Sequence, residues 1–287
     1  MTTEASQYLV ELAHRLARPY LALPQIRAAI LTGSASEGES DFYSDLDVIL
    51  YYDTMPPEAV FASAFEQNNG RDYRVYSPYD EAGFMDFYQV NGIECQFGHS
   101  TIKTWESQMD SVLVGLDVTS PLQKALGGIH DAIPLYGEEF VQSWKDRLAT
   151  YPDALAEAMV KHYLNFFPLW GLQSRFAARD ATIWVYEGLV GIAHNLIGVM
   201  AGLNHLYYTP FQFKKMHRFI DRMPIKPPNF AERIESLFRA DPVQAGLQAE
   251  TLVADALALV AAHMPQIDIS RPQARIGWRQ PMWTIQQ

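Results

Sequence analysis

Cysteine is nearly absent from this chain, with Cys95 the only one among 287 residues. A lone cysteine cannot form an intrachain disulfide, and this usage fits a reducing compartment. We interpret Cys95 as a buried apolar side chain rather than a nucleophile, because it alternates with polar residues in an expected strand. The N-terminal residues include Glu4 and Glu11 and no basic stretch, which indicates no signal peptide. We therefore expect a cytoplasmic protein.

Positive charge is also scarce. The chain carries 22 Lys and Arg residues against 33 Asp and Glu residues, a net charge of −11. Proteins hold nucleic acids mainly through clustered Lys and Arg, so nucleic acid is not an expected partner. Hydrophobic residues make up 48% of the sequence and aromatic residues 13%, which argues against a disordered chain. A length of 287 residues suits two domains or one large domain.

Several familiar catalytic motifs are missing. The eight histidines are scattered without an H-E-x-x-H pattern, which argues against a zinc site, and no G-x-S-x-G or G-x-G-x-x-G pattern occurs. Gly33–Ser40 reads G-x-x-x-x-G-E-S, one residue away from a P-loop. Glu39 stands where the P-loop lysine meets the phosphates, and a carboxylate there would repel them. We reject this motif.

The hydrophobic stretch Ile183–Leu203 is apolar enough to raise the question of a membrane helix, and it contains Glu187, His194 and Asn195 without basic flanks. A membrane-spanning helix needs about 20 consecutive, predominantly apolar residues. We therefore interpret the stretch as a buried helix in a helical domain and expect no membrane association.

The most informative segment is a strand, a Gly-Ser turn and a second strand that opens with two aspartates. An apolar run ends at Gly33-Ser34, and Asp45 and Asp47 begin the next apolar run after a gap of ten residues. Strand residues alternate faces, so the two aspartates share one face and repel each other unless a cation lies between them. Oxygen ligands suit Mg²⁺ together with substrate phosphates, and the turn offers N–H groups and a hydroxyl to a phosphate chain. The alternative is a solvated acidic loop, which explains a lone pair of aspartates but not this combination.

A third carboxylate is expected from a hairpin. Asn91-Gly92 lies between two alternating runs, which is the strongest short-range hairpin signal. Glu94 on the second strand faces away from the core and would approach the two aspartates if their strands are neighbours. Metal-dependent phosphoryl transfer uses such a carboxylate as a ligand or proton acceptor. Asp86 on the first strand is the reserve candidate, and an ordinary exposed glutamate is the alternative for Glu94.

These residues resemble a known family, the nucleotidyltransferase superfamily typified by DNA polymerase β. The chain looks most like its small bacterial members, the aminoglycoside and lincosamide nucleotidyltransferases. The resemblance covers residues 26–99 and rests on Gly33-Ser34, the ten-residue gap, Ser44-Asp45-Leu46-Asp47 and Glu94.

The resemblance implies a Mg²⁺-dependent enzyme with ATP as the donor substrate. In such enzymes the Gly-Ser turn holds the triphosphate, the two aspartates bind Mg²⁺, and the third carboxylate is a metal ligand or general base. The implied nucleotide-binding residues are Gly33, Ser34 and Ser44, and the implied metal and catalytic residues are Asp45, Asp47 and Glu94.

The cation that neutralises the triphosphate is not evident beside the turn, where many relatives have a basic residue and this chain has Glu37. Similar proteins have an aromatic segment followed by a lysine in the helical domain. Here the aromatic segment 206–211 precedes Lys214 and Lys215, of which we prefer Lys214. The alternative is a solvated lysine pair at a helix start.

The pattern of elements predicts an α+β protein. We expect a small mixed β-sheet nucleotidyltransferase domain over residues 1–135, with helices on one side, followed by an all-helical domain over residues 136–287. The tail 265–287 carries three arginines and two tryptophans, Arg271, Arg275, Arg279, Trp278 and Trp283. It is either a terminal arm held by its tryptophans or part of an acceptor site.

The expected reaction moves a nucleoside monophosphate, AMP from ATP, to a hydroxyl of a small molecule. The acidic chain suits a cationic acceptor such as an aminoglycoside, and a lincosamide is the other antibiotic considered. Oligomeric state and the identity of the acceptor are left open by the sequence. One alternative keeps the chemistry and acts on a protein or tRNA, as nucleotidyltransferase toxins do. Another is a catalytically silent, antitoxin-like nucleotide-binding partner, against which the three carboxylates argue.

Overall fold

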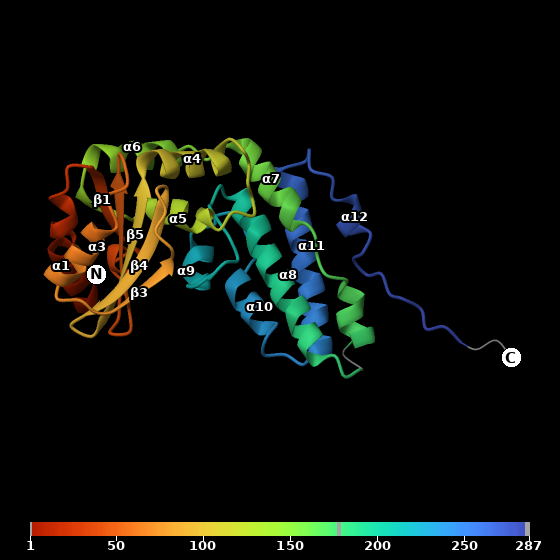
Figure 1. The fold of residues 1–287 in the computed structure, drawn as a ribbon. Helices are drawn as coiled ribbons and strands as arrows, with labels where there is room; N and C mark the ends of the chain where they lie inside the picture. Colours follow the sequence, from red (N-terminus) through yellow and green to blue (C-terminus); the bar gives the residue numbers. More distant parts are fainter. Residues whose placement is uncertain (1, 177–178, 285–287) are drawn as a thin grey trace. The chain divides into compact units, whose positions relative to one another are not determined.

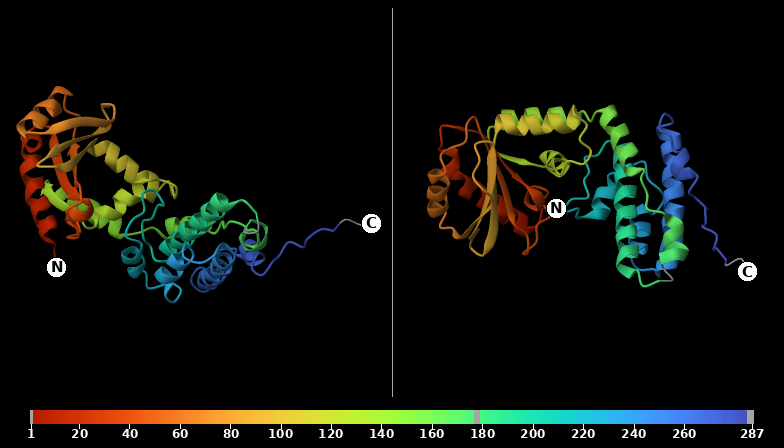
Figure 2. Two further views of the ribbon diagram at one scale, coloured as in Figure 1. Left: turned by 90° about the horizontal axis from the view of Figure 1, so that it is seen from below. Right: turned by 45° about the vertical axis from the view of Figure 1, so that its right-hand side comes forward.

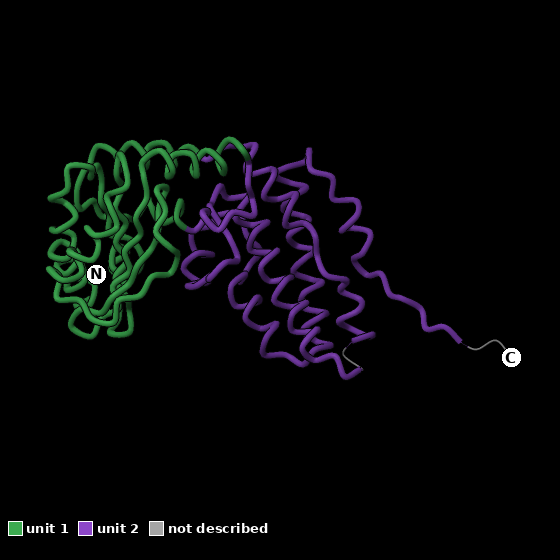
Figure 3. The backbone as a smooth tube through the Cα atoms, in the orientation of Figure 1, with its two compact units in different colours: residues 1–115, 125–150 green, residues 116–124, 151–287 purple. Residues whose placement is uncertain are grey.

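The computed structural model describes residues 2–176 and 179–284 and divides into two compact units (Figure 3). The first unit comprises the chain up to Gly115 together with Ala125–Thr150. The second comprises Leu116–Lys124 and the chain from Tyr151 onward. A mixed sheet forms the centre of the first unit and helices form the second, which confirms the predicted α+β class.

The first unit contains a six-stranded sheet with the order β3-β4-β5-β2-β1-β6 (Figure 1). The parallel pair is β2 with β5, and the other neighbouring strands are antiparallel. The strands are β1 (Ile26–Thr32), β2 (Leu46–Tyr52), β3 (Arg71–Ser77), β4 (Gly83–Val90), β5 (Ile93–Thr101) and β6 (Ile133–Tyr136).

The predicted hairpin is confirmed as β4 and β5, which pair from Val90 and Ile93 outward. Asn91 and Gly92 connect them with φ angles of 54° and 81°. Two successive positive φ angles define the tight hairpin turn for which Asn-Gly is preferred. The hairpin brings β5 next to β2, because β5 pairs with β2 along its other edge.

One face of the sheet is covered by α1 (Glu4–Leu21) and α3 (Ala59–Gln67), which lie on the same side of the strands in both views of Figure 2. Thr3 caps α1 by accepting a hydrogen bond of 3.1 Å from the backbone N–H of Ser6. Leu16 of α1 and Phe97 of β5 are fully buried members of this core.

The opposite face is covered towards the far end of β2, where Tyr51 contacts two tryptophans. Trp105 comes from α4 (Ile102–Leu113) and Trp144 from α6 (Glu138–Ala149), with ring centroids 5.6 and 4.6 Å from that of Tyr51. The expectation of helices on one side was therefore wrong. Tyr51 faces the same side as the aspartates, and its bulk requires an apolar cover.

Strand β6 adds to the sheet beyond β1, with which it pairs antiparallel. The expected boundary between residues 135 and 136 falls inside this strand, and α6 after it also belongs to the first unit. Four residues that include Pro134 are too short to show a period-two pattern, so the strand depends on pairing with β1. The unit also contains α2 (Gly33–Ser36) and most of α5 (Leu122–Ile129).

The second unit is built around α7 (Asp153–Tyr163), α8 (Thr182–Leu203) and α11 (Pro242–His263), with a π-helix over Gly171–Phe176. Helix α8 approaches α7 closely at Gly198, where an added Cβ would lie 2.3 Å from the Tyr163 ring. The shorter helices are α9 (Met216–Asp221), α10 (Phe230–Ser236) and α12 (Ser270–Gln273).

Helices α8 and α11 are long and apolar enough to cross a membrane by length and composition alone. Their most apolar windows are 56% and 50% buried inside the protein, and the two helices contact each other. This burial is the pattern of core helices in a helical bundle.

Candidate nucleotide and metal site

The Gly-Ser turn and the aspartates meet where β1 ends and β2 begins. Thr32, the last residue of β1, is in register with Asp47 on β2. Gly33 follows Thr32 directly and starts the single turn of α2. The two parts of the motif, separated by a loop in the sequence, are therefore neighbours on adjacent strands.

Gly33 and Asp47 are in close contact. Gly33 has a φ of +72°, and a Cβ added to it would lie 2.3 Å from Oδ2 of Asp47. Any side chain at this position would collide with the carboxylate and would also adopt a left-handed conformation. Glycine is therefore required for the Asp47 carboxylate to lie against the turn.

The loop after the turn is fixed by the start of α1. The hydroxyls of Ser34 and Ser40 are 3.0 Å apart, and Ser40 is buried. The Ser40 N–H donates to Oγ of Ser6 at 2.8 Å, and the Thr3 hydroxyl donates to the Ser40 carbonyl at 2.7 Å. These bonds hold Ser34 in a defined position beside Gly33.

Ser44 closes a small turn before the first aspartate. Its Oγ accepts from the Asp41 N–H at 3.0 Å and donates to Oδ1 of Asp41 at 3.1 Å. This turn exposes the rings of Phe42 and Tyr43, whose exposed fractions are 87% and 98%. Ser44 thus has a structural role in the loop, and its nucleotide-binding role stays a prediction.

Asp45 and Glu94 are bridged by a glutamine on β5. The Gln96 side-chain amide donates to Oδ2 of Asp45 at 2.8 Å and to Oε1 of Glu94 at 3.4 Å. Gln96 is also in register with Asp47 on the parallel strand, so all four side chains lie on one face of the sheet. The structure therefore brings the three predicted carboxylates to the same region.

Arg74 on β3 was missed by the sequence analysis. Its guanidinium donates to Oε2 of Glu94 at 2.8 Å, and both side chains are partly exposed. In-register pairing places Arg74 opposite Phe87, and Phe87 opposite Gln96, so the row continues across the sheet to Asp47. The sequence around Arg74 gives no sign that this residue belongs to the site. Its position there follows from the order and register of the strands.

Asp86, the reserve candidate for the third carboxylate, lies on the other face of the sheet and is fully buried. It contacts Nε2 of His99 at 3.3 Å and accepts a hydrogen bond of 3.1 Å from Tyr73. His99 in turn is 3.0 Å from the Tyr52 hydroxyl. Asp86 cannot join Asp45 and Asp47, because it lies on the core face of β4 together with Phe84 and Tyr88, each two residues away.

The residues fit Mg²⁺ as a pair of carboxylates rather than as a closed cage. Among the described residues, no three His, Cys, Asp or Glu side chains are gathered in a way that could hold a metal ion. Asp45 and Asp47 are half-buried on one strand face and offer hard oxygen ligands. Mg²⁺ usually takes one or two protein carboxylates and completes its shell with water and substrate phosphates.

Lys214 lies in the second unit, exposed in the segment before α9. Its neighbour Lys215 has a left-handed φ of 57° at the start of α9. The assignment of Lys214 to the triphosphate stays a prediction.

Cys95 is fully buried on the core face of β5, as the sequence analysis predicted. Burial raises the pKa of its thiol from the ordinary value of 9.0 to about 12. Since the thiolate is the nucleophilic form, this pKa excludes Cys95 as a nucleophile at neutral pH.

No family model matches the chain, and neither does any curated protein. Solved structures resemble it at low sequence identity, and three of them are as follows. A nucleotidyltransferase-like protein from Exiguobacterium sibiricum 255-15 is 12% identical, with a TM-score of 0.43 over 90% of this chain and 81% of the other. Terminal uridylyl transferase 4 from Trypanosoma brucei, with bound GTP, is 14% identical, with a TM-score of 0.30 over 91% and 67%. Cid1 in complex with its short product ApU is 12% identical, with a TM-score of 0.28 over 91% and 68%.

Proposed function

We propose that this protein is a Mg²⁺-dependent nucleotidyltransferase that moves AMP from ATP to a hydroxyl of a small molecule. The observation that carries the proposal is the contact between Gly33 and Asp47. It places a turn suited to phosphates directly against a carboxylate suited to a metal ion.

Each residue of the site has a role in this reaction. Gly33 and Ser34 hold the triphosphate, while Asp45 and Asp47 hold Mg²⁺, which neutralises charge on the phosphates. The acceptor oxygen forms a bond to the α-phosphorus as the bond to pyrophosphate breaks. Glu94 takes the proton of the acceptor hydroxyl. Lys214 supplies a further positive charge to the triphosphate.

The acceptor in this proposal is a small cationic molecule, such as an aminoglycoside, with a lincosamide as the second candidate. The exposed rings of Phe42 and Tyr43 precede Asp45 by only a few residues, and aromatic faces attract cations. The net charge of −11 favours the same class of acceptor. We propose a cytoplasmic location, because the only cysteine is a buried free thiol.

The test is pyrophosphate release from ATP and Mg²⁺ against a panel of aminoglycosides and lincosamides. Asp47→Ala is the blank, and Asp53→Ala, which removes an exposed carboxylate paired with Arg27 beyond the other end of β2, is the matched control. Release that needs one acceptor, survives Asp53→Ala and vanishes in Asp47→Ala supports the proposal. A labelled protein or RNA after incubation of a lysate with labelled ATP, with no release from the panel, contradicts the small-molecule acceptor.

One observation favours a second function, a nucleotide-binding protein without turnover. Arg74 engages the carboxylate that would accept the proton. Glu94→Gln separates the two functions. In an enzyme this variant binds ATP as the wild type does and loses turnover, whereas in a silent protein it changes neither property.

A further inference from the structure

The helical unit contains a cavity that the proposed reaction does not use. It has a volume of about 550 Å³ and lies between the end of α7, helix α11 and the chain that follows α11. Small-molecule sites have volumes of about 300–1,000 Å³. The cavity is therefore large enough for a small ligand, and all of its lining belongs to the second unit.

Three cationic side chains and one carboxylate line this cavity. The cations are Lys161, Arg271 and Arg275, and the carboxylate is Asp268. Asp268 accepts a hydrogen bond of 2.9 Å from the backbone N–H of Ser270, and its bonds to Ser270 lower its pKa. The lining is thus cationic in a chain whose net charge is −11.

The two arginines have unused hydrogen-bonding capacity. Lys161 is paired with Glu157 at 2.9 Å. Across residues 2–176 and 179–284, by contrast, the side chains of Arg271 and Arg275 form neither an ion pair nor a hydrogen bond. Guanidinium groups present several fixed N–H donors, and a phosphate or carboxylate satisfies two of them at once.

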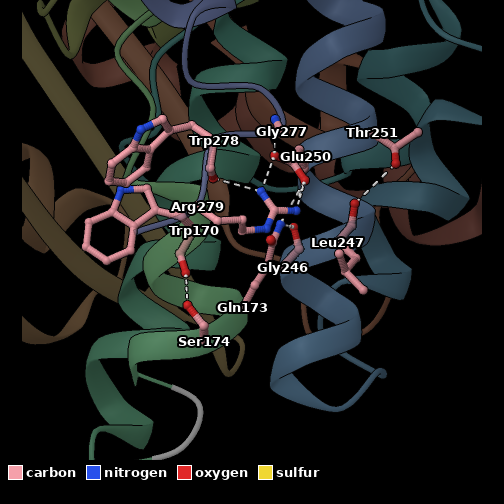
Figure 4. A network of polar contacts seen from close by, with 10 residues as sticks. All are labelled: Trp170, Gln173, Ser174, Gly246, Leu247, Glu250, Thr251, Gly277, Trp278 and Arg279. Carbon is pink, nitrogen blue, oxygen red and sulfur yellow. Dashed lines mark hydrogen bonds and ion pairs between the residues drawn. The ribbon is translucent and has the colours of Figure 1, made fainter. Parts of the chain in front are cut away.

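The segment that carries the arginines is held in place by a separate network (Figure 4). Arg279 donates to both oxygens of Glu250, at 3.1 and 2.8 Å, and the Gly277 N–H donates to Glu250 at 2.8 Å. Partial burial alone would raise the pKa of Glu250, but hydrogen bonds from Arg279, Gly277 and Gln173 lower it overall. Trp278 packs edge-on against Trp170, with ring centroids 5.2 Å apart.

Arg279 therefore has a structural role in the tail, whereas Arg271 and Arg275 line the cavity. The contact of Trp278 with Trp170 fits the first possibility for the tail, an arm held by its tryptophans, and a role in an acceptor site stays a prediction. Residues 285–287 lie outside the described part of the chain.

Apolar side chains form the rest of the cavity wall. Phe166 and Leu169 are buried and Phe167 is half-buried, all in the segment that follows α7. A ligand that fills the cavity must therefore combine an anionic group with an apolar or aromatic body. A phosphate monoester, with a charge of about −1.5 to −2 at neutral pH, complements the two guanidinium groups of Arg271 and Arg275 better than a single carboxylate would.

We propose that this cavity is a binding site for a small phosphate monoester with an apolar or aromatic body. Arg271 and Arg275 bind the phosphate, and Phe166 and Phe167 contact the body. The site is separate from Asp45 and Asp47 and does not require the proposed reaction.

Calorimetric titration with phenyl phosphate in EDTA tests this site without metal. The variants are Arg271→Gln and Arg275→Gln, and the control is Arg239→Gln, an exposed arginine of the same unit paired with Glu235. We expect each cavity variant to weaken binding about tenfold or more and the control to bind as the wild type does. Inorganic phosphate should bind more weakly than phenyl phosphate, because it lacks the aromatic body.

The same titration on Asp47→Ala separates this site from the proposed active site. Binding that persists in Asp47→Ala and is weakened by the arginine variants supports the cavity site, whatever the outcome of the pyrophosphate assay. The proposal is overturned if wild-type protein does not bind phenyl phosphate at millimolar concentration, or if the arginine variants bind it equally well. Equal affinity for inorganic phosphate and phenyl phosphate, or loss of binding in Asp47→Ala, also overturns it.

Discussion

The Gln96 amide lies 2.8 Å from the Asp45 carboxylate, across the parallel pair of β2 and β5. The same amide reaches Glu94, so a single neutral donor stands between two carboxylates that would otherwise repel each other. A bound cation would relieve the same repulsion. The Gln96 amide therefore reduces the repulsion between Asp45 and Glu94, and the proposed Mg²⁺ would reduce it further.

Gln96→Glu tests this balance of charge. The substitution replaces the donor with a fourth carboxylate beside Asp45, Asp47 and Glu94, and we expect it to destabilise the fold without metal by about 1 kcal/mol, or about 2–4 °C in melting temperature. Mg²⁺ should restore more stability to this variant than it adds to the wild type. Thermal melts with EDTA and with Mg²⁺ measure both effects, and Gln67→Glu, on the exposed face of α3, is the control. If Mg²⁺ does not change the melting temperature of Gln96→Glu, the proposed metal site is contradicted.

Gly33→Ala should affect activity far more than stability. The new Cβ would displace the Asp47 carboxylate, so we expect pyrophosphate release to fall about a hundredfold or more, while the left-handed φ costs about 1–2 kcal/mol of stability. Gly92→Ala is the matched control, because Gly92 has a φ of +81° and an added Cβ there meets nothing within 4 Å. If both variants lose activity equally, the Gly33–Asp47 contact does not explain the loss of activity in Gly33→Ala.

Lys214 and Arg74 should differ in their kinetic effects. We expect Lys214→Gln to raise KM for ATP about tenfold, because Lys214 is assigned to the triphosphate. Arg74→Gln should change kcat with little change in KM, because Arg74 acts by positioning Glu94. Steady-state kinetics measure both quantities. The reverse pattern would assign the triphosphate to the cation on the sheet instead.

The buried thiol of Cys95 should make stability decrease at high pH. Burial raises its pKa from 9.0 to about 12, so the folded state keeps a proton that the unfolded state loses above pH 9.0. The resulting stabilisation is present below that pH and decreases by about 1.4 kcal/mol per pH unit between the two pKa values. Urea unfolding of wild type and Cys95→Ala from pH 8 to 11 measures the difference, and parallel pH dependences would contradict this coupling.

Local signals in the sequence were sufficient for the elements around the site. Asn91-Gly92 predicted the hairpin, and the alternation of Asp45 and Asp47 predicted their shared face, because both are set by neighbouring residues. Asp86 was retained as a candidate although it lies two residues from Phe84 and two residues from Tyr88 on its strand. Residues two apart share a strand face, so this spacing places Asp86 in the core, and the sequence already contained the signal against it.

Other features depend on tertiary pairing and have no local signature. Residues 133–136 form strand β6 because they pair with the edge of β1. Arg74 lies in the row of Asp47 because of the register of four neighbouring strands. The assignment of residues 116–124 to the second unit likewise follows from contacts distant in the sequence, such as that between the Gln123 side chain and the backbone N–H of Tyr208. Patterns within one segment cannot specify such partners.

The most direct test of the central claim is the affinity for ATP in the presence of Mg²⁺, measured by calorimetry on wild type and on Asp45→Asn/Asp47→Asn. If the aspartates hold the metal that binds the nucleotide, the double variant should bind ATP at least about tenfold more weakly, and EDTA should weaken the wild type to the same level. Equal affinity in the two proteins, with and without Mg²⁺, would contradict the metal-dependent nucleotide site.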